Sequence, residues 1–120
     1  MAHIDQHALA AFIQHDDELL GELAIMFVQS LPDSEARLRY AVDHRDASVL
    51  RETVHQLKSR LAYFSAESLQ QQALHLEQCG RGNQLDEARP LVEQLLIGIE
   101  EMLCELRLLT RLPLQYSCDD

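Results

Sequence analysis

The sequence predicts an all-α protein, an antiparallel four-helix bundle with a short extra N-terminal helix. Leu, Ala, Gln, Glu and Arg dominate its 120 residues, and these residue types favour helix. Apolar residues recur at the three- and four-residue spacing of amphipathic helices. The chain has only four Gly, three Pro, three Phe and three Tyr, a composition that argues against a sandwich or a barrel. Its length fits a single domain over residues 1–120 with one buried core.

The first part of the chain divides into three expected helical segments. A short leading helix is predicted over residues 4–13, where apolar residues share one face. The bundle core is expected to begin near residue 16, with a helix over residues 17–31. Pro32 should kink or restart this helix, because proline lacks the N–H that continues the helical bonding. The helical pattern then resumes over residues 33–45.

The helix predicted over residues 47–64 has the clearest pattern. Asp46 is its expected N-cap, since an Asp side chain accepts hydrogen bonds from the free N–H groups of a first turn. Apolar residues form a narrow inward stripe, consisting of Leu50, Val54, Leu57, Leu61 and Phe64. With about 100° between successive residues, His55 lies roughly 140° from the middle of this stripe. His55 is therefore predicted to face solvent.

Two further helices complete the bundle. Ser65 can cap the next helix, which the glycine-containing run at residues 79–83 ends. The last helix is predicted over residues 86–111, with Pro90 in its first turn, where the missing N–H has no helical partner to lose. Residues 113–120 are expected to form a loose tail outside the core.

The last helix also carries a second apolar stripe. It consists of Val92, Leu96 and Leu103, with Leu108 and Leu112 beyond them. Such a stripe marks either a fully buried bundle helix or a face that pairs with a second copy of the chain. We expect a monomer, and a dimer is the alternative.

Charge, targeting signals and cysteines exclude several function classes. The net charge is -10, which excludes a general nucleic-acid binder and a polybasic membrane-surface protein. The sequence shows neither a signal-peptide pattern nor an apolar run long enough to span a bilayer. Its three cysteines are odd in number and form no CxxC pair, so a reduced, cytoplasmic setting is expected. Cys79 and Cys104 fit core or rim positions better than nucleophilic ones.

The surface around His55 is predicted to be locally basic and open. Arg51, Lys58, Ser59 and Ala62 share its side of the helix, and Lys58 is the only lysine in the chain. Neutral imidazole is a good nucleophile near pH 7. A neighbouring cation can offset the charge of a transferred phosphoryl group. The pattern therefore indicates phosphoryl acceptance; the alternative is that His55 is simply an exposed histidine.

The same residues carry a resemblance to a known family. The run His55-Gln56-Leu57-Lys58-Ser59 is followed by Ala62, Ser65-Ala66, Leu69, Ala73 and Leu76-Glu77. This pattern resembles the signature of the histidine-containing phosphotransfer (HPt) domain of two-component phosphorelays, over about residues 50–82. The number and order of the predicted helices also agree with that family.

The resemblance implies a role for each site residue. His55 is similar to the histidine that accepts the phosphoryl group, and Lys58 is similar to the lysine beside that group. Glu77 occupies the position of an acidic or amide residue that can hydrogen-bond the imidazole from the neighbouring helix. The alternative for Glu77 is a plain solvated carboxylate.

The resemblance also implies partners and a mechanism. Such a domain takes a phosphoryl group from an aspartyl phosphate on a receiver domain of a hybrid sensor kinase or response regulator, and passes it to another receiver aspartate. The receiver supplies Mg²⁺ and the acidic site. No cofactor, metal or autokinase activity is therefore expected of this chain, whose sequence has no nucleotide-binding loop. Arg51, Ser59 and Ala62 are expected to contribute to the docking surface around His55.

Two departures from the family pattern leave partner choice and transfer rate open. Ser59 stands where the family often has glycine, so the approach to His55 is tighter. Ser65 replaces a second glycine at the turn between two helices. Neither change removes the nucleophile.

Two other interpretations rest on weaker patterns. A helical adaptor that docks on a kinase or response regulator without being phosphorylated is the main alternative function, but it would need neither His55 nor Lys58. His3 and His7 are four residues apart and could chelate a metal. Two histidines without a third fixed ligand make a weak signal for a metal site.

Overall fold

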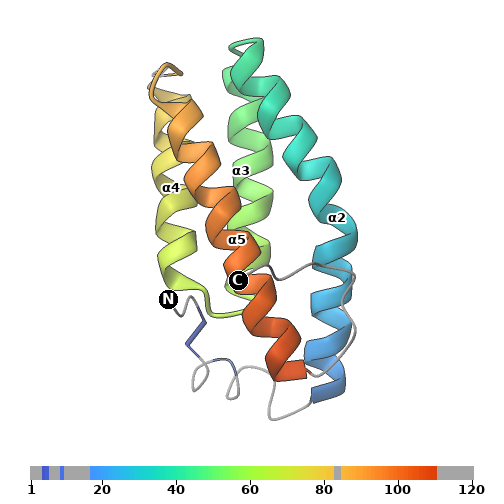
Figure 1. Ribbon diagram of the computed structural model, residues 1–120. Helices are drawn as coiled ribbons and strands as arrows, with labels where there is room; N and C mark the ends of the chain where they lie inside the picture. The colour runs from blue at the N-terminus through green and yellow to red at the C-terminus, as the bar shows by residue number, and fades with distance from the viewer. Residues whose placement is uncertain (1–3, 6–8, 10–16, 83–84, 111–120) are drawn as a thin grey trace.

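Four helices make up most of the chain that the computed structural model describes, which is residues 4–5, 9, 17–82 and 85–110. They are α2 (Asp17–Asp43), α3 (Ala47–Ala62), α4 (Glu67–Arg81) and α5 (Ala88–Thr110), and no strand occurs among these residues. Each helix packs against the next one along the chain, and α5 packs against α2. Figure 1 shows an elongated bundle in which consecutive helices run in opposite directions. The predicted all-α bundle is confirmed.

The predicted leading helix, residues 4–13, falls mostly outside the described residues. Ile4 and Leu9 are described, and both are buried against the core. The Asp5 N–H donates a hydrogen bond to the carbonyl of Ser65 at 3.2 Å. This bond ties the described start of the chain to the turn between α3 and α4.

The structure corrects the expected restart of the helix at Pro32, because α2 continues through this residue as one helix. Leu31 and Ser34, on either side of the proline, are both buried, so both halves of the helix pack on the same core. Pro32 is exposed, and water on that side can satisfy the carbonyl that loses its helical partner. Packing of the flanking residues therefore outweighs the missing hydrogen bond.

The turn before α3 confirms the predicted cap. The Asp46 carboxylate accepts a hydrogen bond from the Val49 N–H at 3.1 Å. This bond satisfies one of the N–H groups that have no partner within the first turn. Helix α3 therefore starts at the predicted residue, Ala47.

The turn between α3 and α4 corrects the role predicted for Ser65. Its φ is 53°, in the left-handed region that residues other than glycine rarely adopt. The N-cap of α4 is Ala66, and no side chain caps that helix. Ser65 therefore shapes the turn and does not cap the helix, which gives a physical reason for the glycine in the family pattern.

Replacing Ser65 with glycine should stabilise the protein. A non-glycine residue in the left-handed region costs roughly 1–2 kcal/mol, and the greater unfolded-state freedom of glycine offsets about 0.5–1 kcal/mol of that. We expect the free energy of unfolding to rise by about 0.5–1 kcal/mol, measured as a higher urea midpoint. Ser48→Gly, at an exposed helical position of α3, is the matched control and should give no gain. A lower midpoint for Ser65→Gly would contradict the proposed strain.

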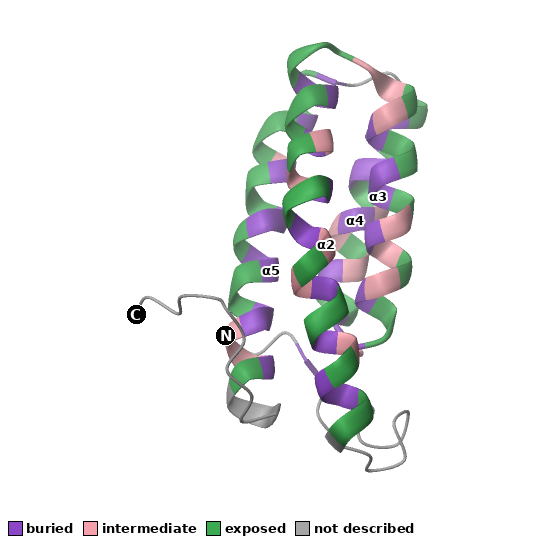
Figure 2. Cartoon of the chain, turned by 90° about the vertical axis from the view of Figure 1, so that its right-hand side faces the viewer, coloured by how far each residue is buried: buried purple, intermediate pink, exposed green. Residues whose placement is uncertain are grey.

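The buried faces of the helices meet in one core, seen as the purple stripes in Figure 2. The predicted inward stripe of α3 is confirmed, since Leu50, Val54, Leu57, Leu61 and Phe64 are each at most 1% exposed. Helix α3 is thus held on its apolar side, and its opposite side is left for solvent.

The second stripe of α5 belongs to the same core. Val92, Leu96 and Leu103 are buried within the single chain, so these residues do not form an exposed face for a second copy. The side chains of Leu108 and Leu112, and the tail predicted over residues 113–120, lie outside the described part of the structure.

Cysteines and apolar helices bear on the expected cellular setting. Cys79 is a buried free thiol, but Cys104 is disulfide-bonded. The expectation of reduced cysteines is therefore wrong for Cys104, because an odd count still leaves room for one pair. None of the described helices has both the length and the apolar composition needed to cross a membrane.

Candidate functional site

Helix α3 presents His55 to solvent, as its spacing predicts. The apolar residues of this helix point into the bundle and place His55 on the outer side. The exposed fraction of the His55 side chain is 65%. His55 is therefore not a core histidine.

Glu77 on α4 brings the predicted site residues together. Its Oε2 lies 3.2 Å from His55 Nδ1, and its Oε1 accepts a hydrogen bond from Lys58 Nζ at 3.1 Å. The exposed fraction of the Glu77 side chain is only 5%, so the alternative of a plain solvated carboxylate is wrong. Residues from two helices thus form one hydrogen-bonded cluster.

This geometry determines which imidazole nitrogen is free to react. An ionised carboxylate can only accept hydrogen bonds. In the neutral imidazole, Nδ1 therefore carries the proton, and its N–H donates a hydrogen bond to Glu77. Nε2 then holds the ring's free lone pair. Because the His55 side chain is mostly exposed, it can approach a group on another molecule.

The charge of Glu77 results from opposing effects. Burial favours the neutral acid, but hydrogen bonds from Lys58 and His55 and the charges of Lys58 and Arg81 outweigh it. Together they hold the pKa of Glu77 below its usual value of 4.5. The buried carboxylate is therefore ionised at neutral pH and remains an acceptor for His55.

This lowered pKa predicts a loss of stability in acid. A carboxyl whose pKa is lower in the folded state than in the unfolded chain stabilises the fold above the unfolded value, and this contribution disappears as pH falls through the folded value. Below about pH 4.5, the free energy of unfolding should fall less steeply with decreasing pH in Glu77→Gln than in wild type. Urea unfolding between pH 7 and pH 3 measures both slopes. Glu67→Gln, an exposed change on the same helix, is the control, and equal slopes for wild type and Glu77→Gln would contradict the prediction.

Arg81 is a member of this cluster that the sequence reasoning missed. Its Nη2 donates to Glu77 Oε1 at 3.3 Å, the same oxygen that Lys58 contacts. Arg81 follows Glu77 by four residues on α4, a spacing at which helical side chains are neighbours. That spacing could have indicated the contact. We call His55, Lys58, Glu77 and Arg81 the Glu77 cluster.

The three residues predicted to dock a partner are all exposed on α3. The Ser59 hydroxyl donates to the His55 carbonyl at 3.2 Å, so it is engaged with its own helix. Arg51 lies across Gly80 of α4, where a Cβ would come within 2.6 Å of Arg51 Cγ. Gly80 thus makes room for the Arg51 side chain. A docking role for Arg51, Ser59 and Ala62 remains a prediction.

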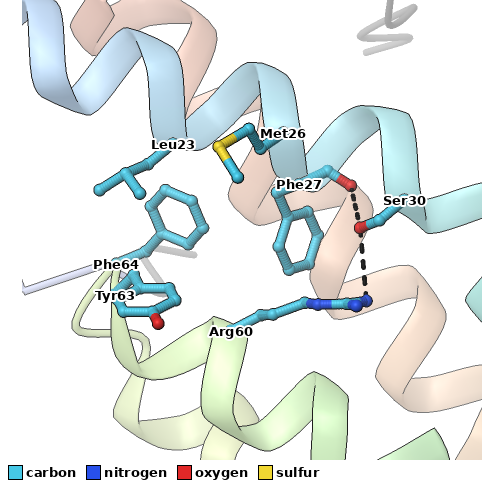
Figure 3. A pocket seen from close by; sticks show the side chains of 7 residues that line it. All are labelled: Leu23, Met26, Phe27, Ser30, Arg60, Tyr63 and Phe64. Carbon is cyan, nitrogen blue, oxygen red and sulfur yellow. Dashed lines mark hydrogen bonds between the residues drawn. The ribbon is translucent and has the colours of Figure 1, made fainter.

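A separate pocket of about 300 Å³ lies between α2 and the end of α3. Figure 3 shows its largely apolar lining and Arg60 extending toward Ser30. Arg60 Nη1 donates to the hydroxyls of Ser30 and Ser34 at 3.4 and 3.3 Å. Arg60 therefore links α3 to α2.

The described part of the chain contains no group of three or more His, Cys, Asp or Glu side chains arranged to hold a metal ion. The predicted His3 and His7 pair lies outside the described residues.

Comparisons with known proteins identify the family. The model of the Hpt domain family matches residues 22–107, a segment that includes the whole Glu77 cluster. Among solved structures, the chain is similar to histidine-containing phosphotransfer protein B (HptB) from Pseudomonas aeruginosa PAO1, with 27% sequence identity, 91% of each chain covered and a TM-score of 0.74. No curated protein matches the sequence. Because the family match spans well over half of the sequence, this chain belongs to the Hpt domain family.

Proposed function

We propose that this protein is a phosphorelay intermediate that accepts a phosphoryl group on His55 from a receiver-domain aspartyl phosphate and passes it to another receiver aspartate. Family membership gives the coarser role, histidine phosphotransfer in phosphorelays. The observation that best supports the finer role is the contact of His55 Nδ1 with the buried Glu77, which leaves Nε2 of an exposed ring as the nucleophile.

The proposed transfer requires no proton to leave the ring. The Nε2 lone pair attacks phosphorus while the bond from phosphorus to the aspartate oxygen breaks, and that electron pair stays on the departing carboxylate. The ring becomes a phosphorylated imidazolium with Nδ1 still protonated. Glu77 lies 3.2 Å from Nδ1, where its negative charge offsets the charge that develops on the ring. Transfer to the next aspartate is the reverse of this step.

Lys58 is the proposed cation for the phosphoryl oxygens. It follows His55 by three residues on α3 and is therefore a neighbour on the same helix. Its charge can offset the negative charge of the transferred group. The receiver is proposed to supply Mg²⁺ and the acidic site, so this chain acts as a phosphocarrier without autokinase activity, cofactor or metal.

The proposed partners are receiver domains of a hybrid sensor kinase, of a response regulator, or of both. Arg51, Lys58 and Arg81 place positive charge around His55 in a chain of net charge -10, and this local charge complements the acidic site of a receiver. Exposed Ser59 and Ala62 extend the same surface. We propose a transient contact that weakens with salt, made by a cytoplasmic monomer.

The direct test is transfer of a ³²P label from a phosphorylated receiver domain to the full chain. A small-molecule phosphoramidate serves as a second donor, because it does not depend on the choice of receiver. Label that acid removes and base does not supports a phosphoramidate on histidine. If neither donor labels the folded protein, the proposal is wrong, and the adaptor that docks without being phosphorylated becomes the better explanation.

A further inference from the structure

We infer that Arg81 is a positioning residue for this transfer, which holds the buried carboxylate of Glu77 when Lys58 leaves it for the phosphoryl group. The inference rests on the proposed function of His55.

Two cations share one oxygen of Glu77. Lys58 Nζ and Arg81 Nη2 lie 3.1 and 3.3 Å from Oε1, while His55 Nδ1 lies 3.2 Å from Oε2. A buried carboxylate needs at least one charge partner, because an unpaired charge away from water is strongly unfavourable. Glu77 therefore has one cation more than its single negative charge requires. One of the two can leave without isolating the carboxylate.

Lys58 must change partner to neutralise a phosphoryl group on His55. Nδ1 and Nε2 are on opposite edges of the imidazole ring, so Glu77 and a phosphoryl group on Nε2 flank the ring from opposite sides. In the structure, Lys58 Nζ is bonded on the carboxylate side. A phosphoryl group on Nε2 competes with Oε1 for this ammonium, and in the inferred exchange the bond to Oε1 is released.

The positions of the two cations indicate which one moves. Lys58 is on the same helix as His55 and less than one turn away. Arg81 follows Gly80, where an added Cβ would lie 3.5 Å from the carbonyl oxygen of Ala47, about two helical turns before His55 on α3. The backbone of Arg81 therefore lies toward the N-terminal side of His55 along α3, and Lys58 lies on its C-terminal side. Its guanidinium keeps its charge and has several donors, so it can remain on the carboxylate.

Without Arg81, the exchange becomes unfavourable. Before the new bond to phosphorus charges the ring, departure of Lys58 would then leave Glu77 with only the N–H of a neutral His55 Nδ1, in a site where the carboxylate is 5% exposed. Lys58 would stay on Glu77, and the phosphoryl group would lose its nearest cation. A neutral amide at position 77 has no charge to balance, so it removes the need for Arg81.

A double-variant cycle tests this coupling through the rate of phosphoryl transfer from a receiver domain to the full chain. Arg81→Gln is expected to lower the rate about tenfold, which is the size of effect expected when one charge that is coupled to Glu77 is lost. Arg81→Lys keeps a cation and should recover most of the rate. On a Glu77→Gln background, Arg81→Gln should have little further effect.

The controls distinguish the positioning role of Arg81 from a general effect of its charge, from loss of folding and from direct contact with the receiver. Arg89→Gln removes the same charge from a side chain of matching exposure, 63% against 64% for Arg81, and should keep the wild-type rate. Urea unfolding confirms that each variant is folded. A wild-type rate for Arg81→Gln overturns the inference. An equal tenfold loss with and without Glu77 also overturns it, since Arg81 would then act directly on the receiver or the phosphoryl group.

The inference and the proposed function fail in distinguishable ways. Wild type that takes no label from the receiver or from a phosphoramidate overturns both. Wild type that is labelled on His55, with a rate independent of Arg81, overturns only the positioning role.

Discussion

Replacing His55 with glutamine is expected to abolish phosphoryl acceptance and leave the bundle folded. The His55 side chain is 65% exposed and lies outside the core, so the free energy of unfolding should change by no more than about 0.5–1 kcal/mol. Glutamine can still donate a hydrogen bond to Glu77, but its amide nitrogen has no free lone pair comparable to that of Nε2. The acid-labile, base-stable label should therefore fall to background, and the urea midpoint should barely move.

The matched control for this variant is His75→Gln. His75 is an exposed histidine on α4, two residues before Glu77, and it has the same chemistry without the contacts of the Glu77 cluster. We expect this variant to take the full wild-type label. Label that persists on His55→Gln with the same chemical stability would place the acceptor on another residue and make the assignment of His55 wrong.

Helical periodicity predicts most of this fold because it depends on neighbouring residues only. The spacing of apolar residues identifies each helix of the bundle and correctly places His55 on the solvent side of α3. Rules based on neighbouring residues fail where tertiary packing determines the local structure. Pro32 should interrupt a helix in isolation, but burial of its neighbours Leu31 and Ser34 keeps α2 continuous. Ser65 is a good capping residue by type, but the direction change between α3 and α4 puts it at φ 53°.

The candidate site likewise has residues that the sequence alone brings together and residues whose contact depends on packing between helices. His55 and Lys58 are close because they lie on one helix, so the sequence alone predicts their proximity. Glu77 follows His55 by 22 residues on another helix, and only the family resemblance, not the periodicity, pairs them. Arg81 was missed because a charged residue four positions after a glutamate is common on helix surfaces. Its importance follows from the burial of Glu77, which is a property of the packed bundle.

Truncating Phe64 to alanine is expected to lower the free energy of unfolding by about 3–5 kcal/mol, the range for large-to-small changes in a core. Phe64 is 1% exposed, and its ring packs edge-to-face on Phe27 with 5.6 Å between centroids. It also lines the pocket between α2 and α3 (Figure 3). Truncation removes these contacts and enlarges the existing pocket of about 300 Å³, so neighbouring side chains cannot easily close the gap.

Tyr63→Ala is the matched control, because Tyr63 lines the same pocket but is 45% exposed. Its loss removes less buried area and should cost about 1 kcal/mol, measured with Phe64→Ala by urea unfolding. Equal losses for the two variants would contradict the core role of Phe64. A loss of about 3–5 kcal/mol is a large share of the roughly 5–15 kcal/mol that stabilises a typical domain. Phe64→Ala should therefore lower labelling of His55 through the fraction of unfolded chain, and labelling per folded molecule should stay at the wild-type level because the Glu77 cluster remains intact.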